Sequence, residues 1–261
     1  MKTYTILVAA YFACGCGPDP VGPVGPDLAV VADLAVTTDA SVDFGADPNA
    51  ILGTFAGPCG SVLAQLHSPS PSLIDNALVF VAGEAYVRSS FSPDGQRLFD
   101  TPNAGGSSTE SELMSEEILH YCDGAHFLKS ETEIGYTPPD TDAGGNIITD
   151  ILVAFGNDKV GVSVTRAYKP GGMSDLEIHD LLVKKLDGIN HSSARVLPAD
   201  KWVKQILHVF VDAQAASDAI TRVLPTIDAV TRADTIVLTT TTTGGGFIYC
   251  NPNPPLGQEC P

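Results

Sequence analysis

The order of segments between residues 107 and 242 constrains the fold of this chain most. Some segments repeat apolar residues at helical spacing, and others are short apolar or alternating runs typical of strands. We expect helix, three strands, helix, strand, helix and strand at 109–121, 127–136, 147–155, 160–166, 174–189, 202–211, 213–224 and 234–240. Three successive strands followed by crossover helices predict a mixed sheet with helices on its faces, in the α/β (α+β) class.

Several local signals support these segments. Residues 160–166 alternate strictly, with three valines on one face and Gly, Ser and Thr on the other. Thr109 with Glu112, and Ser174 with Glu177, match the capping box that starts a helix. We expect the second of these helices to end near Gly188.

Residues 50–106 are predicted to extend the globular part on its N-terminal side. Residues 77–82 form an apolar run that predicts a strand. Residues 91–98 contain Ser-Pro-Asp-Gly, a turn signal that resembles the turn repeated in β-propeller blades. A propeller repeats its motif at a period of roughly 40–50 residues. The motif occurs once here, so we predict a single hairpin turn.

The predicted order of elements resembles the core of the PD-(D/E)xK nuclease superfamily, the restriction-endonuclease-like fold, over residues 107–242. This resemblance implies an Asp at the start of the second strand, where the chain has Asp150. It also implies a Glu from the first helix, for which Glu116 and Glu117 are the candidates. A nuclease of this family would use these carboxylates to hold a divalent metal ion.

The third strand departs from the family's pattern. The resemblance implies an acid and a Lys two residues apart, and the chain has Ser163 and Thr165 at those positions. A Mg²⁺ nuclease site needs at least two anionic oxygen ligands and a cation or base near the phosphate. A serine supplies no charge and a threonine does not replace an ammonium group. We therefore expect the fold without the nuclease chemistry, and no cofactor.

The alternative is a divergent metal-dependent nuclease or phosphodiesterase. In that case Asp150 would bind Mg²⁺ together with Glu133 or Glu117. Glu131 shares a face with Glu133 and is a further candidate ligand. The missing positive charge would come from Lys184, Lys185 or Arg166.

The first sixteen residues have the pattern of an export signal. Lys2 precedes an apolar stretch at residues 6–13, which is too short to span a bilayer and ends at Cys14-Gly15-Cys16. A small residue before a Cys at this place resembles the lipobox of bacterial lipoproteins. The resemblance implies cleavage before Cys14 or Cys16 and a diacylglycerol on its thiol. Neither Cys is followed by Asp, which in this family implies the outer membrane.

Residues 17–49 are rich in Pro, Gly and Asp, with six acidic residues and no basic one between 19 and 47. Such a composition predicts a disordered tether. The whole chain has a formal charge of −17. This charge repels phosphate backbones and disfavours general nucleic-acid binding.

Four further cysteines predict two disulfides in an oxidising compartment, with three pairings open. Cys250 and Cys260 flank a Pro-rich stretch within the tail 243–261, and pairing them leaves Cys59 with Cys122.

His120, Cys122 and His126 have a spacing that zinc sites allow. We assign no metal ligand on this basis, because Cys122 fits a disulfide in an exported protein. The sequence thus predicts a lipid-anchored cell-envelope protein whose domain binds or scaffolds without catalysis. Its expected partners are a membrane, through the anchor, and an unknown protein or small-molecule ligand.

Overall fold

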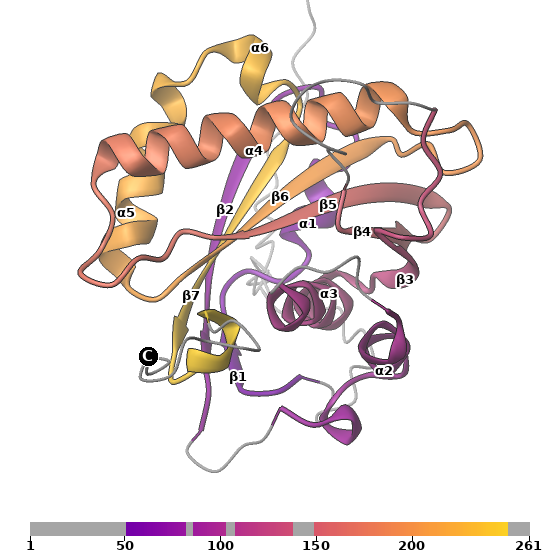
Figure 1. Ribbon diagram of the computed structural model, residues 1–261, viewed down its shortest axis with the longest axis horizontal. Helices are drawn as coiled ribbons and strands as arrows, with labels where there is room; N and C mark the ends of the chain where they lie inside the picture. Colours follow the sequence, from indigo (N-terminus) through magenta and orange to yellow (C-terminus); the bar gives the residue numbers. More distant parts are fainter. Residues whose placement is uncertain (1–50, 82–85, 103–107, 138–148, 250–261) are drawn as a thin grey trace, which may run out of the picture. The chain divides into compact units, whose positions relative to one another are not determined.

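A computed structural model of the chain describes residues 51–81, 86–102, 108–137 and 149–249. The expected signal segment, the expected tether and the Cys250–Cys260 pair lie outside these residues. The described residues form a seven-stranded mixed sheet with helices on its faces (Figure 1). Among them, no helix is both long enough and apolar enough to cross a membrane.

The sheet has the order β1-β2-β7-β6-β5-β4-β3. Its strands are β1 Thr54–Ala56, β2 Ser72–Val79, β3 His126–Ser130, β4 Ile151–Phe155, β5 Asp158–Arg166, β6 Lys204–Val211 and β7 Ile236–Thr243. β3, β4 and β5 form an antiparallel meander, and β5, β6, β7 and β2 are parallel. β1 pairs antiparallel with β2 at the other edge. The prediction of a mixed α/β sheet is confirmed.

Helices cover both faces of the sheet (Figure 1). Their bounds are α1 Ser61–Gln65, α2 Pro93–Asp100, α3 Thr109–Asp123, α4 Asp175–Arg195, α5 Gln214–Val223 and α6 Ala229–Arg232, with 3₁₀ segments η1 Arg88–Ser90, η2 Leu224–Thr226 and η3 Gly246–Tyr249. α2 and α3 lie on one face, and α4, α5 and α6 lie on the other. From α3 to β7 the elements follow the predicted order.

Each face of the sheet has its own apolar core. Val160, Val162 and Val164 of β5 belong to the core that includes residues of α1, α2 and α3. The other core joins β6 and β7 to α4 and α5. The valines therefore share one face, as their alternation predicts. Gly161, on the opposite face, lies under Trp202, and a Cβ there would be 2.8 Å from the indole ring.

The predicted hairpin turn at residues 91–98 is wrong, because this segment begins α2. Ser92 is the N-cap and its hydroxyl accepts the N–H of Gly95 at 2.9 Å. Pro93 occupies the first helical turn, where its missing N–H is not needed. Leu98 is buried in the core, and this packing favours a helix rather than a hairpin turn.

Several predicted boundaries also differ from the structure. The strand expected at 77–82 is β2, which begins at Ser72 and ends at Val79. The strand expected at 127–136 ends at Ser130, because the Glu133 carboxylate accepts the Ser130 N–H at 2.9 Å and turns the chain. α3 begins at Thr109 but its N-cap is Ser108, whose hydroxyl donates to Glu112.

The predicted start of α4 is confirmed, but its predicted end is wrong. Ser174 and Glu177 form the predicted capping box. The helix continues past Gly188 to Arg195. Ile189 and Ser192 are buried beyond that glycine, and their packing outweighs its low helix propensity of about 1 kcal/mol.

Candidate functional site

Asp150 lies immediately before β4 and is held against β5. Its carboxylate accepts the Ser163 hydroxyl at 3.1 Å and the Val164 backbone N–H at 2.6 Å. Its own N–H donates to the carbonyl of Val162 at 3.1 Å. Asp150 thereby extends the β4–β5 pairing by one residue. Ser163, at the position of the family's acid, is a hydrogen-bond donor to this carboxylate.

Two further charges act on Asp150. Burial raises the pKa of the Asp150 carboxyl, the Lys185 ammonium on α4 lowers this pKa, and Glu131 raises it. Glu133 is used elsewhere, because its carboxylate accepts both the N–H and the hydroxyl of Ser130. Ser163 therefore contacts the Asp150 carboxylate directly, Lys185 and Glu131 act on it through their charges, and Glu133 is engaged in a turn.

Glu117 is not part of this group. It lies on α3, and its carboxylate accepts the Ser92 N–H at 3.0 and 3.2 Å. α3 packs on the valine face of β5, whereas Ser163 points to the opposite face with α4. The sheet lies between the two carboxylates, so they do not share one ion.

A second cluster of chemically active side chains lies beside α3. Asp94 from the first turn of α2, His120 from the last turn of α3 and His126 from the start of β3 each offer one ligand atom. These atoms all lie within 4.8 Å of one another. Asp94 and His120 are half-buried and His126 is exposed.

The C-terminal turn of α3 brings the two histidines together. Gly124 is left-handed, with φ of 67°, and its N–H bonds to the carbonyl of His120 at 3.0 Å. The N–H of Ala125 then reaches the carbonyl of Leu119 at 3.2 Å. This reversal places His126 next to His120, with ring centroids 6.0 Å apart.

Hydrogen bonds orient both rings. His120 Nδ1 lies 2.8 Å from the carbonyl oxygen of Ala125. A carbonyl only accepts, so Nδ1 carries the proton and Nε2 keeps a lone pair. His126 Nδ1 lies 3.2 Å from Asp94 Oδ2, which also accepts the Phe127 N–H at 3.2 Å.

Two buried carboxyl groups lie behind this cluster on α3. Burial raises the pKa of Glu116 well above its ordinary range, and the charges of Glu117 and Asp94 raise it further. Burial also raises the pKa of Glu117. Arg97 lowers the pKa of Glu116, and its guanidinium donates to the carbonyls of Phe127 and Leu128. The side of α3 next to the cluster therefore carries the acids Glu116 and Glu117, with Arg97 as a nearby cation.

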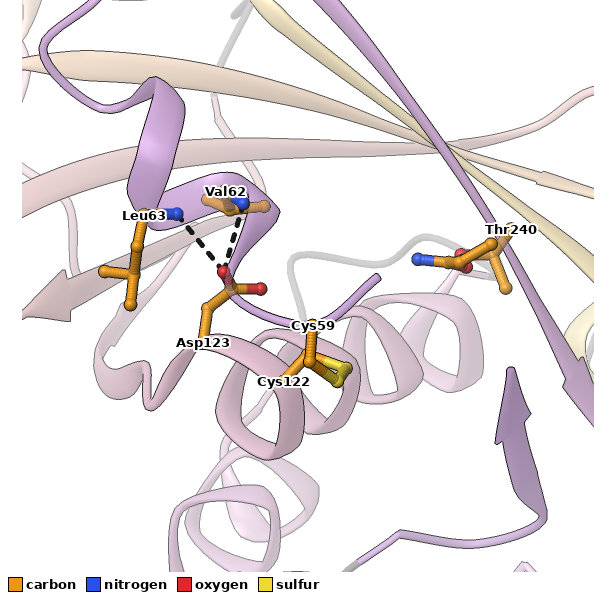
Figure 2. Close-up of a disulfide and its surroundings, with 7 residues drawn as sticks. Cys59, Val62, Leu63, Cys122, Asp123 and Thr240 are labelled. Carbon is orange, nitrogen blue, oxygen red and sulfur yellow. Dashed lines mark hydrogen bonds between the residues drawn. A yellow bond between two sulfur atoms is a disulfide. The ribbon is translucent and has the colours of Figure 1, made fainter. Parts of the chain in front are cut away.

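A disulfide between Cys59 and Cys122 ties the loop before α1 to α3 (Figure 2). This pair is one of the pairings that the sequence left open. The neighbouring Asp123 accepts the N–H groups of Val62 and Leu63 at 3.0 and 3.2 Å and caps α1. The Cys122 sulfur is therefore bonded and is not a metal ligand.

The sequence pattern singled out His120 and His126 but assigned them no metal, and it gave no role to Asp94. Asp94 belongs to the segment assigned to a hairpin turn. The sequence does contain a signal for a helix start at this place. In Ser-Pro-Asp, the Ser suits an N-cap, and the Pro and the Asp suit the first helical turn.

A buried polar chain crosses the same face of the sheet under α3. His208 Nδ1 lies 2.8 Å from the Ser115 hydroxyl, and Nε2 lies 2.7 Å from the Thr240 hydroxyl. Thr240 donates to Asn76 at 2.6 Å, so Nε2 is the protonated nitrogen and Ser115 donates to Nδ1. Burial lowers the pKa of His208 to about 3. Because His208 is fully buried, substrate does not reach it.

A cavity of about 240 Å³ lies where β5 and β6 end. It is lined in part by Lys169, Gly172, Met173, Asp212 and Ala213. The carboxyl ends of parallel strands are where α/β sheets commonly bind ligands. Among the described residues, its lining includes neither Asp150 nor the histidine cluster.

Comparison with known proteins gives one similar sequence. The AAC-rich mRNA clone AAC4 protein of Dictyostelium discoideum is 38% identical to this chain over 201 residues, which is 73% of the chain. The chain spans about a quarter of that protein's length, 26%. No family model matches the chain. No solved structure matches it either.

Proposed function

We propose that this chain is an exported, lipid-anchored cell-envelope protein whose α/β domain binds or scaffolds without nuclease catalysis. The Cys14-Gly15-Cys16 sequence after an apolar stretch supports the anchor. The Cys59–Cys122 disulfide supports export, because disulfides persist in oxidising compartments. The anchor implies a membrane as one partner, at the outer membrane or the cell surface.

The arrangement around Asp150 carries the non-catalytic part of the proposal. Its carboxylate is held by Ser163 and Val164, and Glu133 and Glu117 are engaged elsewhere. A Mg²⁺ site needs at least two convergent anionic ligands. The cavity beside Lys169 is the place we propose for a small-molecule or peptide ligand, and the net charge of −17 disfavours nucleic acid.

Labelling with radioactive palmitate in a bacterial host tests the anchor. We expect incorporation into the wild-type chain and its loss in Cys14→Ser or in Cys16→Ser, whichever carries the lipid. Cys260→Ser is the matched control and keeps the label. Unlabelled wild-type chain, in a host that labels a known lipoprotein, contradicts the anchor.

Incubation of the purified full chain with DNA or RNA and Mg²⁺ or Mn²⁺ tests the absence of nuclease chemistry. We expect both nucleic acids to stay intact. Cleavage that Asp150→Asn abolishes overturns this part of the proposal, because the carboxylate would then be essential to the reaction.

A specific observation favours one alternative, a divergent metal-dependent phosphodiesterase. The charges of Glu131 and Lys185 both act on the Asp150 carboxyl, and a second carboxylate and a cation are the residue types that such a site uses. In this alternative Asp150 and Glu131 hold Mg²⁺ and Lys185 stabilises the phosphate. It predicts cleavage that Lys185→Met abolishes and that Lys184→Met, at the neighbouring exposed lysine, retains.

A further inference from the structure

We infer that Asp94, His120 and His126 form a Zn²⁺-binding site with an open coordination position. The inference is independent of the lipid anchor and of Asp150, because the cluster lies on α2, α3 and β3. Two imidazoles and one carboxylate make up a donor set that zinc takes in sites with three protein ligands.

The distances suit a single ion. Zinc binds nitrogen and oxygen at roughly 2.0–2.2 Å, which puts neighbouring ligands of a tetrahedron roughly 3.3–3.6 Å apart. His126 Nδ1 and Asp94 Oδ2 are already 3.2 Å apart. The whole ligand set spans 4.8 Å at most. The His126 side chain is 68% exposed, so it is free to turn toward the ion.

The hydrogen bond of His120 prepares it as a ligand. Its Nδ1 donates to the Ala125 carbonyl at 2.8 Å and leaves the lone pair of Nε2 available. Metal-binding histidines characteristically donate their second ring N–H to a carbonyl or carboxylate in this way. The turn at Gly124 fixes that carbonyl relative to the ring.

A buried carboxyl group, Glu116, interacts electrostatically with the Asp94 ligand of the cluster. Both carboxyl oxygens of Glu116 are buried, and among the described groups only the carboxyl of Glu117 is a hydrogen-bonding neighbour of Glu116. Asp94 and Glu117 are the acids whose charges act on Glu116, with Arg97 as a compensating cation. A divalent cation held by Asp94 and the two imidazoles would offset the negative charge of the Asp94 carboxylate beside this buried acid.

The disulfide decides the class of site. With the Cys122 sulfur bonded to Cys59, the ligand set has no thiolate from α3. Structural zinc sites are closed by four protein ligands, whereas sites with three keep a position for water or a ligand. The fourth position here therefore takes water, or a carboxylate or carbonyl oxygen from a bound molecule.

Calorimetric titration with Zn²⁺ alone tests the site. The full chain is used with its disulfide formed, its free thiols alkylated and all metal removed by chelation. We expect one Zn²⁺ per chain in a saturable step, and Co²⁺ in its place gives a visible absorption band. Binding should weaken at least about tenfold in His120→Ala and in His126→Ala.

The control is His67→Ala. His67 is likewise an exposed histidine 3.2 Å from an aspartate, Asp158, but it lies outside the cluster. We expect this variant to bind Zn²⁺ like the wild type. His126 is exposed, so its loss leaves the fold intact, and circular dichroism of the metal-free variants verifies this. The inference is overturned if the wild type shows no saturable binding, or if His126→Ala binds as tightly as His67→Ala.

Discussion

At the scale of single residues, His208 shows how burial sets the chemistry of a side chain. The imidazole lies between Ser115 and Thr240 with no access to solvent, and burial lowers its pKa to about 3. An exposed histidine in the unfolded chain has a pKa of about 6.5. Folding therefore requires the neutral form of His208, and protonation opposes folding.

This difference predicts a loss of stability in acid. The contribution of neutral His208 is fully present above pH 6.5 and is lost as the pH falls toward 3, at about 1.4 kcal/mol per pH unit. Between pH 6.5 and pH 5 we expect the free energy of unfolding to fall by about 2 kcal/mol from this group. Urea unfolding of wild type and His208→Gln at both pH values measures the contribution.

The test variant and a control variant should behave differently. His208→Gln should be less stable at pH 7 by about 1–3 kcal/mol, because it disturbs a buried hydrogen-bonded chain. It should also lack this part of the pH dependence. His179→Gln, at a half-buried histidine on the surface of α4, should follow the wild type at both pH values. Equal pH dependence in wild type and His208→Gln contradicts the prediction.

At the scale of elements, the contact between α2 and α3 positions the candidate zinc site. Gly95 allows this contact, because a Cβ there would lie 2.0 Å from Glu117 Oε1. The close approach lets the Glu117 carboxylate accept the N–H of Ser92 at the start of α2. Asp94, in that same first turn, is thereby carried to within reach of the histidines.

We expect Gly95→Ala to destabilise the protein by about 1–3 kcal/mol, because it displaces a buried carboxylate from its hydrogen bond. Helix propensity alone predicts the opposite, a gain of about 1 kcal/mol. In a Glu117→Ala background the clash is absent, so the same substitution should be neutral or stabilising. A double-mutant cycle measured by thermal unfolding separates the two effects. Equal effects in both backgrounds count against the steric explanation.

At the scale of the folded domain, the sheet joins segments that are distant in the chain. β2, from the N-terminal extension, pairs with β7 near the C-terminal end of the core. The Cys59–Cys122 disulfide adds a covalent link between this extension and α3, across 63 residues of sequence. A link over a loop of this length restricts the unfolded chain strongly.

We expect removal of the disulfide to lower the free energy of unfolding by about 2–4 kcal/mol. Cys59→Ser/Cys122→Ser should show this loss in urea, and the wild type with a reducing agent should approach the same value. The double variant should respond less to the reductant than the wild type does. A double variant as stable as the oxidised wild type argues against the link as a major source of stability.

Sequence patterns predicted the elements well where the signal is local. The valine alternation of residues 160–166 and the capping box at Ser174 depend on neighbours within a few residues, and both are confirmed. The segment at Ser92 has signals for both a turn and a helix start. Burial of Leu98 in the core, a long-range effect, selects the helix.

The sequence by itself determined the order of the elements and the mixed α/β class, and it drew attention to two histidines without assigning them a metal. Periodicity and short spacings encode these features. Only the tertiary structure decided which side chains meet. Asp94 joins the histidines because α2 packs against α3 and β3, while Glu117 and Asp150 lie on opposite faces of the sheet. Contacts of this kind depend on strand order and on helix packing between segments that are distant in the sequence. Local periodicity does not carry that information.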